Sequence, residues 1–215
     1  MKSEPIKQKK NNVWIIDESK FLCKNEVNKL KKVSNSQKIQ GLRENRFAPV
    51  RNWFMLELGL NSGLRVSEMA SLTHGCLIIN ESKSSIVVFG KGSKKRAVWI
   101  NSKFRNSCRE YINYKIKFGY SVDSDSYLLN NFNGDKISKR ALQKFFSDLV
   151  KNSGLPAHYH IHCLRHTYAT FLLKASNNNY RFVQSQLGHA SIRTTQIYAG
   201  VIESEGKKAI EKLYD

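Results

Sequence analysis

One pair of β-branched segments constrains the fold of this chain more than any other feature of its sequence. Residues 86–89 (IVVF) and 97–100 (AVWI) form the strong β signal of the chain, and a basic turn with two glycines separates them. Apolar, β-branched runs on either side of a short glycine turn are typical of an antiparallel hairpin. We therefore predict one hairpin here, with a short strand at 77–79 completing a small antiparallel sheet.

Most of the remaining chain carries apolar residues at helical spacing. Between residues 47 and 60 they recur every three or four positions, and residues 138–151 carry an equally clear stripe. The predicted helices cover residues 24–32, 47–60, 64–72, 103–118, 138–151, 163–175, 180–187, 190–198 and 203–214. The expected fold class is mainly α with a small antiparallel β-sheet (α+β).

The length of 215 residues suits one domain with little beside it. We expect a basic, flexible N-terminal arm at residues 1–20 and the domain at residues 21–215. No apolar stretch approaches the roughly 20 residues that span a bilayer, and no apolar region follows the N-terminal lysines as in a secretory signal. The four cysteines are widely spaced without a CxxC pair, which indicates free thiols. A cytoplasmic protein is expected.

The charge of the chain favours a polyanionic partner. Lys and Arg number 36 against 17 Asp and Glu, so the formal net charge is +19. This excess excludes an acidic disordered regulator and makes nucleic acid the leading partner class. The alternative is coding bias, because the chain is rich in Asn as well as Lys.

A histidine-rich segment at residues 158–166 offers two interpretations. In an extended segment His158, His160 and His162 share one face and could bind zinc, although no carboxylate or cysteine pair completes such a site. If a helix starts at this point, His162 and Arg165 share the face of its first turn and suit a phosphate. An ordinary surface His and Arg are the alternative.

Two further segments contain residues that could carry chemistry. The hairpin turn gathers Lys91, Lys94, Lys95 and Arg96, which would face phosphates if DNA is the partner or would form a solvated turn if it is not. Residues 188–198 contain a histidine and, nine positions later, a tyrosine. A tyrosine acts as a nucleophile when a base removes its proton, but the chain has nine tyrosines and chemistry alone does not choose among them.

Taken together, these segments resemble the tyrosine recombinases, also called phage-type integrases, from about Phe21 to the C-terminus. The matching segments are FLCKNEVNKL (21–30), SGLRVSEMASL (62–72), VVFGKGSKKRAVWI (87–100), HCLRHTYATFLL (162–173) and LGHASIRTTQIY (187–198). The resemblance implies the recombinase catalytic-domain fold and six catalytic residues: Arg65, Lys91, His162, Arg165, His189 and Tyr198.

The same resemblance implies a site-specific recombinase that needs neither a metal nor a cofactor. Tyr198 would attack a DNA phosphodiester, leaving a 3′-phosphotyrosyl link and a free 5′-hydroxyl. Arg65 and Arg165 would clamp the phosphate, Lys91 would protonate the leaving oxygen, and His162 would help to deprotonate the tyrosine. His189 would hydrogen-bond the phosphate or brace the site.

The partners implied are double-stranded DNA, further copies of the chain in a tetramer on DNA, and an accessory DNA-bending protein. Residues 203–214 would form a helix that docks either on a neighbouring protomer or on its own domain. Typical members carry a separate helical DNA-clamping domain, for which the residues before Phe21 leave little room, so a short form is expected. The alternatives are a type IB topoisomerase-like enzyme, a decayed or accessory DNA-binding protein, and a generic RNA binder.

Overall fold

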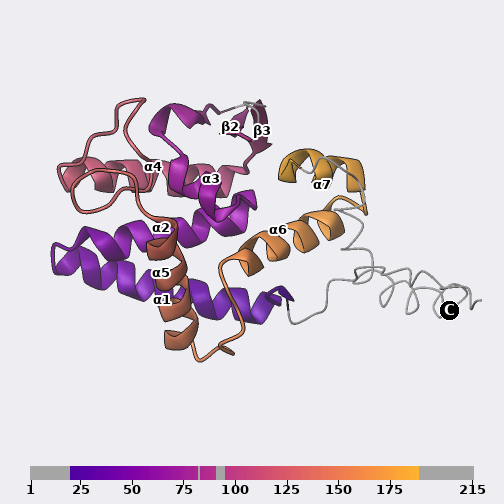
Figure 1. Ribbon diagram of the computed structural model, residues 1–215, viewed down its shortest axis with the longest axis horizontal. Helices are drawn as coiled ribbons and strands as arrows, with labels where there is room; N and C mark the ends of the chain where they lie inside the picture. The colour runs from indigo at the N-terminus through magenta and orange to yellow at the C-terminus, as the bar shows by residue number, and fades with distance from the viewer. Residues whose placement is uncertain (1–19, 82, 91–94, 189–215) are drawn as a thin grey trace, which may run out of the picture.

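The computed structural model describes residues 20–81, 83–90 and 95–188 of the chain. Over these residues the chain folds into α-helices with a small antiparallel sheet at one side (Figure 1). The elements are α1 (Lys24–Arg43), α2 (Phe47–Ser62), α3 (Val66–Ser71), the 3₁₀ helix η2 (His74–Cys76), β1 (Leu77–Ile79), β2 (Ser84–Phe89), β3 (Lys95–Trp99), α4 (Ser102–Lys117), α5 (Lys139–Asn152), α6 (His162–Ala175) and α7 (Tyr180–Leu187). The prediction of a mainly α fold with a small antiparallel sheet is confirmed.

Helix α2 lies at the centre of the fold because it is apolar on most of its surface. It packs against α1, α4 and α6. The ring of Phe54 on α2 stacks on Tyr111 of α4, with the ring centroids 4.0 Å apart. The helix ends at Gly63, whose left-handed φ of 59° favours glycine and where a Cβ atom would collide with the ring of Tyr168. The helix therefore ends two residues before Arg65.

Helix α1 is longer than predicted, since it continues beyond residue 32 to Arg43. Its second half looks polar in sequence, yet Ser34, Lys38 and Gly41 are buried. The ammonium group of Lys38 lies 3.9 Å from the ring centre of Trp53 and 2.9 Å from a carboxylate oxygen of Glu110. Small and snorkelling side chains thus continue the buried face after the apolar stripe has ended.

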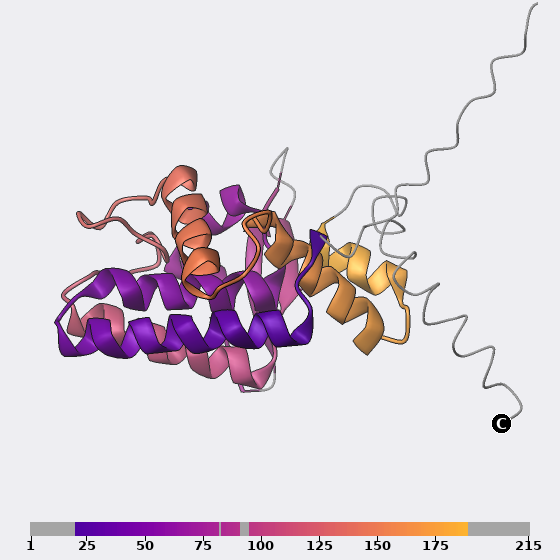
Figure 2. The ribbon, with the colours of Figure 1, turned by 90° about the horizontal axis from the view of Figure 1, so that it is seen from below.

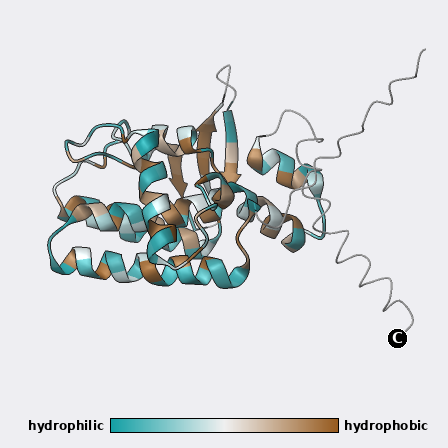
Figure 3. Ribbon diagram, turned by 60° about the horizontal axis from the view of Figure 1, so that its bottom comes forward, coloured by the Kyte–Doolittle hydropathy of each residue, from teal (hydrophilic) through white to brown (hydrophobic). Residues whose placement is uncertain are grey.

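The sheet has the strand order β1-β2-β3, and both pairings are antiparallel. Opposite pairs include Leu77 with Ile86 and Val87 with Ala97, which confirms the predicted hairpin and the short third strand. The apolar residues of these strands stand out against the hydrophilic outer faces of the helices (Figure 3). Residues 91–94 at the hairpin tip lie outside the described ranges.

Helices α6 and α7 extend from one end of the body (Figures 1 and 2). The first half of α6 belongs to the main core through Cys163 and Leu164, whereas Leu173 in its second half joins Val183 and Leu187 of α7 in a small second core. Within the described ranges no helix is long and apolar enough to cross a bilayer. The predicted helices at 190–198 and 203–214 lie outside these ranges.

Candidate active site

Arg65 is placed where α2 stops and α3 begins. The left-handed turn at Gly63 redirects the chain, and Arg65 becomes the N-cap residue of α3 in extended geometry. Its guanidinium Nη1 lies 3.0 Å from Oε1 of Glu68, while its side chain remains 43% exposed. The guanidinium is therefore held at one edge and open to solvent, as a phosphate-binding group must be.

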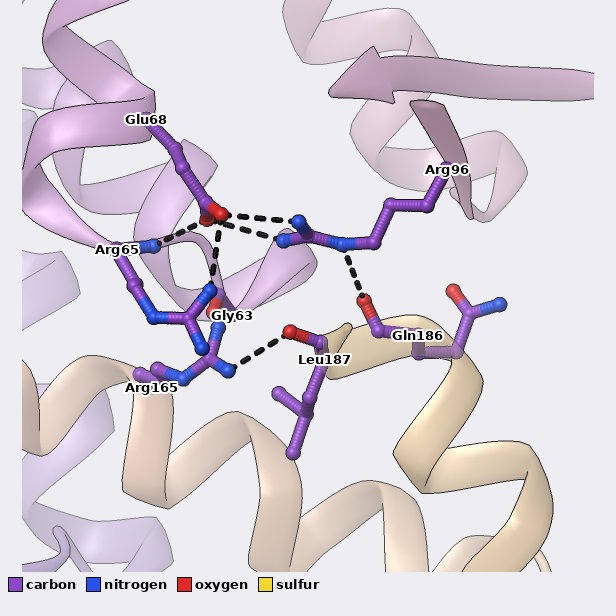
Figure 4. Close-up of polar contacts among 7 residues, drawn as sticks. All are labelled: Gly63, Arg65, Glu68, Arg96, Arg165, Gln186 and Leu187. Carbon is purple, nitrogen blue, oxygen red and sulfur yellow. Dashed lines mark hydrogen bonds and ion pairs between the residues drawn. The ribbon is translucent and has the colours of Figure 1, made fainter. Parts of the chain in front are cut away.

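Glu68 forms the buried centre of this part of the site (Figure 4). Its side chain is 7% exposed, and its Oε2 accepts a 2.8 Å hydrogen bond from the backbone N–H of Arg65, as the third residue of a capping box does. Both carboxylate oxygens also accept hydrogen bonds from Arg96, at 2.9 Å each. Burial alone would raise the pKa of Glu68, but the hydrogen bonds and charges of Arg96 and Arg65 outweigh it and lower the pKa.

Arg165 lies in the first turn of α6 and is almost completely buried. Its Nη1 donates to the carbonyl oxygen of Gly63 at 2.6 Å, and its Nη2 donates to that of Leu187 at 2.8 Å. These two carbonyls lie at the C-terminal ends of α2 and α7, where the helix dipoles favour a cation. The guanidinium thus joins three helices and is fixed before any substrate arrives.

His162 is the first residue of α6, one turn before Arg165, and its ring is exposed. Partial desolvation lowers its pKa, and the neighbouring charges of His160, Arg165 and Arg65 lower it further. A histidine that is neutral near pH 7 can accept a proton, which a general base requires. The two arginines and this histidine therefore gather around one point of the surface.

The zinc interpretation of the histidine-rich segment gains no support from the structure. His158, His160 and His162 are all exposed, as the predicted alternation requires, and the rings of His160 and His162 lie 5.9 Å apart. Nevertheless, among the described residues no group of three or more His, Cys, Asp or Glu side chains is arranged to hold a metal ion.

The base of the hairpin separates two of the residues predicted to contact DNA. Lys95 is exposed, and its Nζ lies 5.3 Å from the ring centre of Phe89. Arg96 points to the opposite face of the strand, as neighbouring strand residues do, and reaches Glu68. Its side chain is only 14% exposed. Arg96 thus lies within the site rather than on the open face of a prong.

The remaining predicted site residues are Lys91, Lys94, His189 and Tyr198, and all four lie outside the described ranges. Next to His189, the described chain ends close to Arg96. Gly188, which precedes His189, has a left-handed φ of 65°, and a Cβ atom at this position would lie 2.7 Å from Cδ of Arg96. Of the six predicted catalytic residues, the structure therefore brings together Arg65, His162 and Arg165.

Sequence reasoning did not identify two residues of this site, Glu68 and Gln186. Glu68 stands three residues after Arg65, which is the capping-box spacing at a helix start and was available as a signal. Gln186 is buried, accepts a hydrogen bond from the backbone N–H of Trp99 at 2.9 Å, and had no signal in the sequence. Its role depends on the contact between α7 and β3.

Comparison with known families identifies the chain. Residues 20–205 match the model described as the phage integrase family, and this range covers most of the chain. The chain belongs to the phage integrase family. The resemblance to tyrosine recombinases noted in the sequence is therefore confirmed.

Relatives within the phage integrase family include the tyrosine recombinases XerC of two bacteria. The XerC of Serratia marcescens is 37% identical over 149 residues, which are 69% of this chain and 47% of that protein. The XerC of Bacillus pumilus is 34% identical over 167 residues, which are 76% of this chain and 52% of that protein. The chain thus spans about half the length of these curated relatives.

Solved structures of recombinases share the fold. The XerH site-specific recombinase bound to a palindromic difH substrate matches with a TM-score of 0.73 and 23% identity, over 91% of this chain and 53% of that one. The XerA recombinase matches with a TM-score of 0.72 and 24% identity, over 91% of this chain and 65% of that one. The predicted recombinase catalytic-domain fold is confirmed.

Proposed function

We propose that this chain cleaves and rejoins DNA at specific sites through a 3′-phosphotyrosyl intermediate. The observation that carries the proposal is that Arg165, in the first turn of the helix that begins at His162, is held against the carbonyl of Gly63, two residues before Arg65. Partial burial, His160 and then both guanidinium charges lower the pKa of the His162 imidazole. Two fixed cations suit the non-bridging oxygens of a phosphodiester, and a neutral histidine suits the proton of an attacking hydroxyl. Membership of the phage integrase family supports the same chemistry.

The proposed cleavage step exchanges one phosphate ester for another. The phenol oxygen of Tyr198 attacks phosphorus, a P–O bond to tyrosine forms, and the bond to the 5′-oxygen breaks. The phenol proton passes to His162, and Lys91 supplies a proton to the leaving oxygen. Attack by the 5′-hydroxyl of another strand reverses the step and joins the strands in a new order, so no external energy source is required.

The arginines and His189 supply the electrostatic part of this proposal. Negative charge grows on the non-bridging oxygens as the five-coordinate centre forms, and preorganised donors lower its energy. Arg165 is held by two carbonyl oxygens and Arg65 by Glu68, so neither guanidinium has to be ordered during the reaction. His189 would donate a hydrogen bond to the same phosphate.

Covalent trapping on nicked DNA tests the proposal. The protein is incubated with nicked duplexes from the DNA that flanks its coding sequence, in the presence of a chelator, and adducts are separated on a denaturing gel. We expect an adduct with the unaltered chain and none with Tyr198→Phe. The matched control is Tyr180→Phe, which also removes one phenol oxygen and should still form the adduct.

Three outcomes would contradict the proposal. An adduct that persists in Tyr198→Phe would show that another residue is the nucleophile. Tight DNA binding without an adduct on any substrate would favour the decayed or accessory DNA-binding protein instead. Relaxation of supercoiled DNA by a monomer, without exchange between paired sites, would favour the topoisomerase-like alternative.

The proposal includes contacts with the DNA backbone. The net charge of +19 and the exposed position of Lys95 support it. Of the residues predicted to contact DNA, Lys94 and Lys95 carry this part of the proposal, because the guanidinium of Arg96 is already engaged by Glu68. Affinity should fall with salt, with a slope of about −0.9 for each phosphate contact.

We also propose assembly into a tetramer on DNA, with residues 203–214 docked on a neighbouring protomer and with a DNA-bending protein as an accessory factor. Sedimentation of a chain cut after Gly200, with and without DNA, tests the docking. Loss of the assembly on DNA would support exchange between protomers. Unchanged assembly would contradict it.

A further inference from the structure

Arg96 occupies an unusual position for a residue in a basic hairpin. It is the second residue of β3, and its guanidinium forms a bidentate pair with Glu68, with both N–O distances at 2.9 Å. Its Nε also donates to the backbone carbonyl of Gln186 at 3.3 Å. With 14% of the side chain exposed, the fork has three of its donors committed to protein acceptors.

These contacts connect the hairpin to two other elements of the site (Figure 4). Through Glu68 they reach α3, where the same carboxylate holds both the backbone N–H and the guanidinium of Arg65. Through Gln186 they reach the last turn of α7. The side chain of Gln186 returns to β3 by accepting from the backbone N–H of Trp99, so α7 and β3 are joined at two points.

The approach of Gly188 reinforces the second connection. A Cβ atom on Gly188 would lie 2.7 Å from Cδ and 2.8 Å from Nε of Arg96, so any other residue at this position would have to displace the Arg96 side chain. The end of α7 therefore contacts the Cδ and Nε atoms of Arg96, and the carboxylate of Glu68 contacts its two terminal nitrogens.

We propose that Arg96 is a positioning residue for the recombination reaction, which acts through Glu68 on Arg65 and through Gln186 on the end of α7. This inference rests on the proposed function. In this role the hairpin, the first arginine and the segment that leads to His189 are held in one arrangement. A shift of the hairpin stem that breaks the pair with Glu68 releases one of the constraints on Arg65.

The rival role for Arg96 is a direct contact with a DNA phosphate, and the two roles differ in what they require of the side chain. A phosphate contact on the backbone requires mainly a positive charge, which lysine also provides. The fork that spans both oxygens of Glu68 and reaches Gln186 requires the planar guanidinium. Lysine also keeps the charge of Glu68 compensated, so Arg96→Lys should fold.

The decisive experiment measures two quantities for Arg96→Lys: the first-order rate of adduct formation at saturating nicked DNA, and the slope of log affinity against log salt. We expect the rate to fall about a hundredfold, as misplacement of a catalytic group by about 1 Å does. The salt slope should stay unchanged. Lys95→Met, on the exposed face of the same strand, should instead reduce the magnitude of the salt slope by about 0.9.

The matched control is Arg46→Met, which removes an arginine from a similar but exposed pair. Arg46 Nη1 lies 2.8 Å from Oε2 of Glu44, and the arginine side chain is 65% exposed. This variant should leave the rate and the salt slope unchanged. Gln186→Met provides a second test of the same connection, because it keeps the backbone carbonyl and removes the acceptor for Trp99; it too should slow adduct formation at an unchanged salt slope.

Two results would overturn the inference. The first is an unaltered rate in Arg96→Lys, with a reduced salt slope in Arg96→Met, because this is the behaviour of a phosphate contact. The second is a rate that falls only in proportion to the folded fraction, measured by circular dichroism, because this is the behaviour of a residue needed for folding alone.

Hydrogen exchange without DNA separates failure of this inference from failure of the proposed function. If the unaltered chain forms no adduct, the proposed function fails, and exchange still reports on the connection. In Arg96→Lys the amides at Trp99 and in the last turn of α7 should exchange faster, while those of α1 stay unchanged. Unchanged exchange at Trp99 and α7 would show that Arg96 holds neither element.

Discussion

At the scale of single residues, the site is organised around one buried carboxylate between two arginines. Glu68 is 7% exposed and accepts hydrogen bonds from Arg96, from the Arg65 backbone and from the Arg65 side chain. A buried charge of this kind is stable only while its partners remain, because the desolvation cost is already present. Its removal should therefore affect folding as well as catalysis.

We expect Glu68→Gln to lower the free energy of unfolding at pH 7 by about 3 kcal/mol, because the guanidinium of Arg96, whose side chain is 14% exposed, loses its counter-charge in a mostly buried position. Urea denaturation of the two proteins measures the difference. The matched comparison is Glu44→Gln, which removes a carboxylate from the exposed pair with Arg46 and should cost much less, because solvent already screens this pair. Equal losses in the two variants would contradict the buried, paired state of Glu68.

The difference in stability between the unaltered chain and Glu68→Gln should depend on pH in a defined direction. The pKa of Glu68 is lowered in the folded state, so the stability that its charge provides is fully present above the ordinary glutamate pKa of about 4.3. It is lost as the pH falls through the lower, folded-state value. The difference in unfolding free energy between the unaltered chain and Glu68→Gln should thus shrink as the pH falls below about 4.3 and through the lower, folded-state pKa. A difference that grows on acidification would show that the pKa is raised.

His162 provides a test of the site's electrostatics that needs no DNA. Partial desolvation and the charges of His160, Arg165 and Arg65 lower its pKa below the ordinary value of 6.5. Arg65→Met removes one of these charges and should raise the pKa of His162, as measured by NMR titration of the ring. Arg46→Met, at the far end of α2, should leave it unchanged. An unmoved pKa in Arg65→Met would place the Arg65 guanidinium too far from the histidine for a shared phosphate.

The sequence predicts some of these residues and not others, for physical reasons. The pairing of His162 with Arg165 can be predicted, because three-residue spacing at a helix start brings the two residues together within one turn. This local geometry does not depend on the rest of the fold. The direction of Arg96 is different, since alternation along a strand predicts that it opposes Lys95 but not which face is inner. That choice depends on Glu68, which lies 28 positions earlier on α3 and is brought near Arg96 only by the tertiary fold.

At the scale of elements, apolar periodicity predicts the full length of helices whose buried faces are apolar. It underestimates the length of helices whose buried faces include polar or small residues. Helices α2, α5 and α7 begin and end within two residues of the prediction. Helix α1 was predicted to end at residue 32 because Ser34, Lys38 and Gly41 give no hydrophobic signal, although all three are buried. The burial of Lys38 depends on Trp53 and Glu110, two partners distant in sequence.

The C-terminal end of α7 is the element boundary with the greatest consequence for the site, and Gly188→Ala tests it. Left-handed geometry alone should cost alanine about 1 kcal/mol. The clash with Arg96 should add about 1–2 kcal/mol, as overpacking does. Urea denaturation measures the total, and adduct formation should slow as well.

Gly154→Ala is the matched control for this prediction. Gly154 has nearly the same left-handed φ, 63° against 65°, but a Cβ atom there would meet nothing within 4 Å. It should therefore show only the conformational cost and leave adduct formation unchanged. If Gly188→Ala cost no more than Gly154→Ala, the close approach of α7 to Arg96 would be contradicted.

At the scale of the whole molecule, the described part has two cores of unequal size with the site between them. The main core contains α2, α4 and the first half of α6, whereas the second core contains four small or aliphatic side chains from α6 and α7: Ala169, Leu173, Val183 and Leu187. Helix α7 is connected to the rest of the molecule by these contacts and by the polar contacts of Arg165, Arg96 and Gln186. The site thus depends on the weaker of the two cores.

This division predicts a gradient of local stability. The amides of α7 should exchange with solvent through a partial opening of lower free energy than global unfolding, because few apolar contacts hold the helix. The amides of α2 should exchange only with global unfolding. Native-state hydrogen exchange at increasing denaturant measures both, and the denaturant dependence should be small for α7 and large for α2, since a partial opening exposes less surface.

Arg165 makes this prediction specific to the site, because its Nη2 bonds the carbonyl of Leu187 at the end of α7. An anion held by the guanidinium in its present position would stabilise the closed arrangement, so inorganic phosphate at high concentration should slow exchange in α7 more than in α2. Sodium chloride at matched ionic strength is the control. If the amides of α7 exchanged at the rate and with the denaturant dependence of those of α2, the molecule would unfold as one unit. The second core would then open with the same free energy as the first.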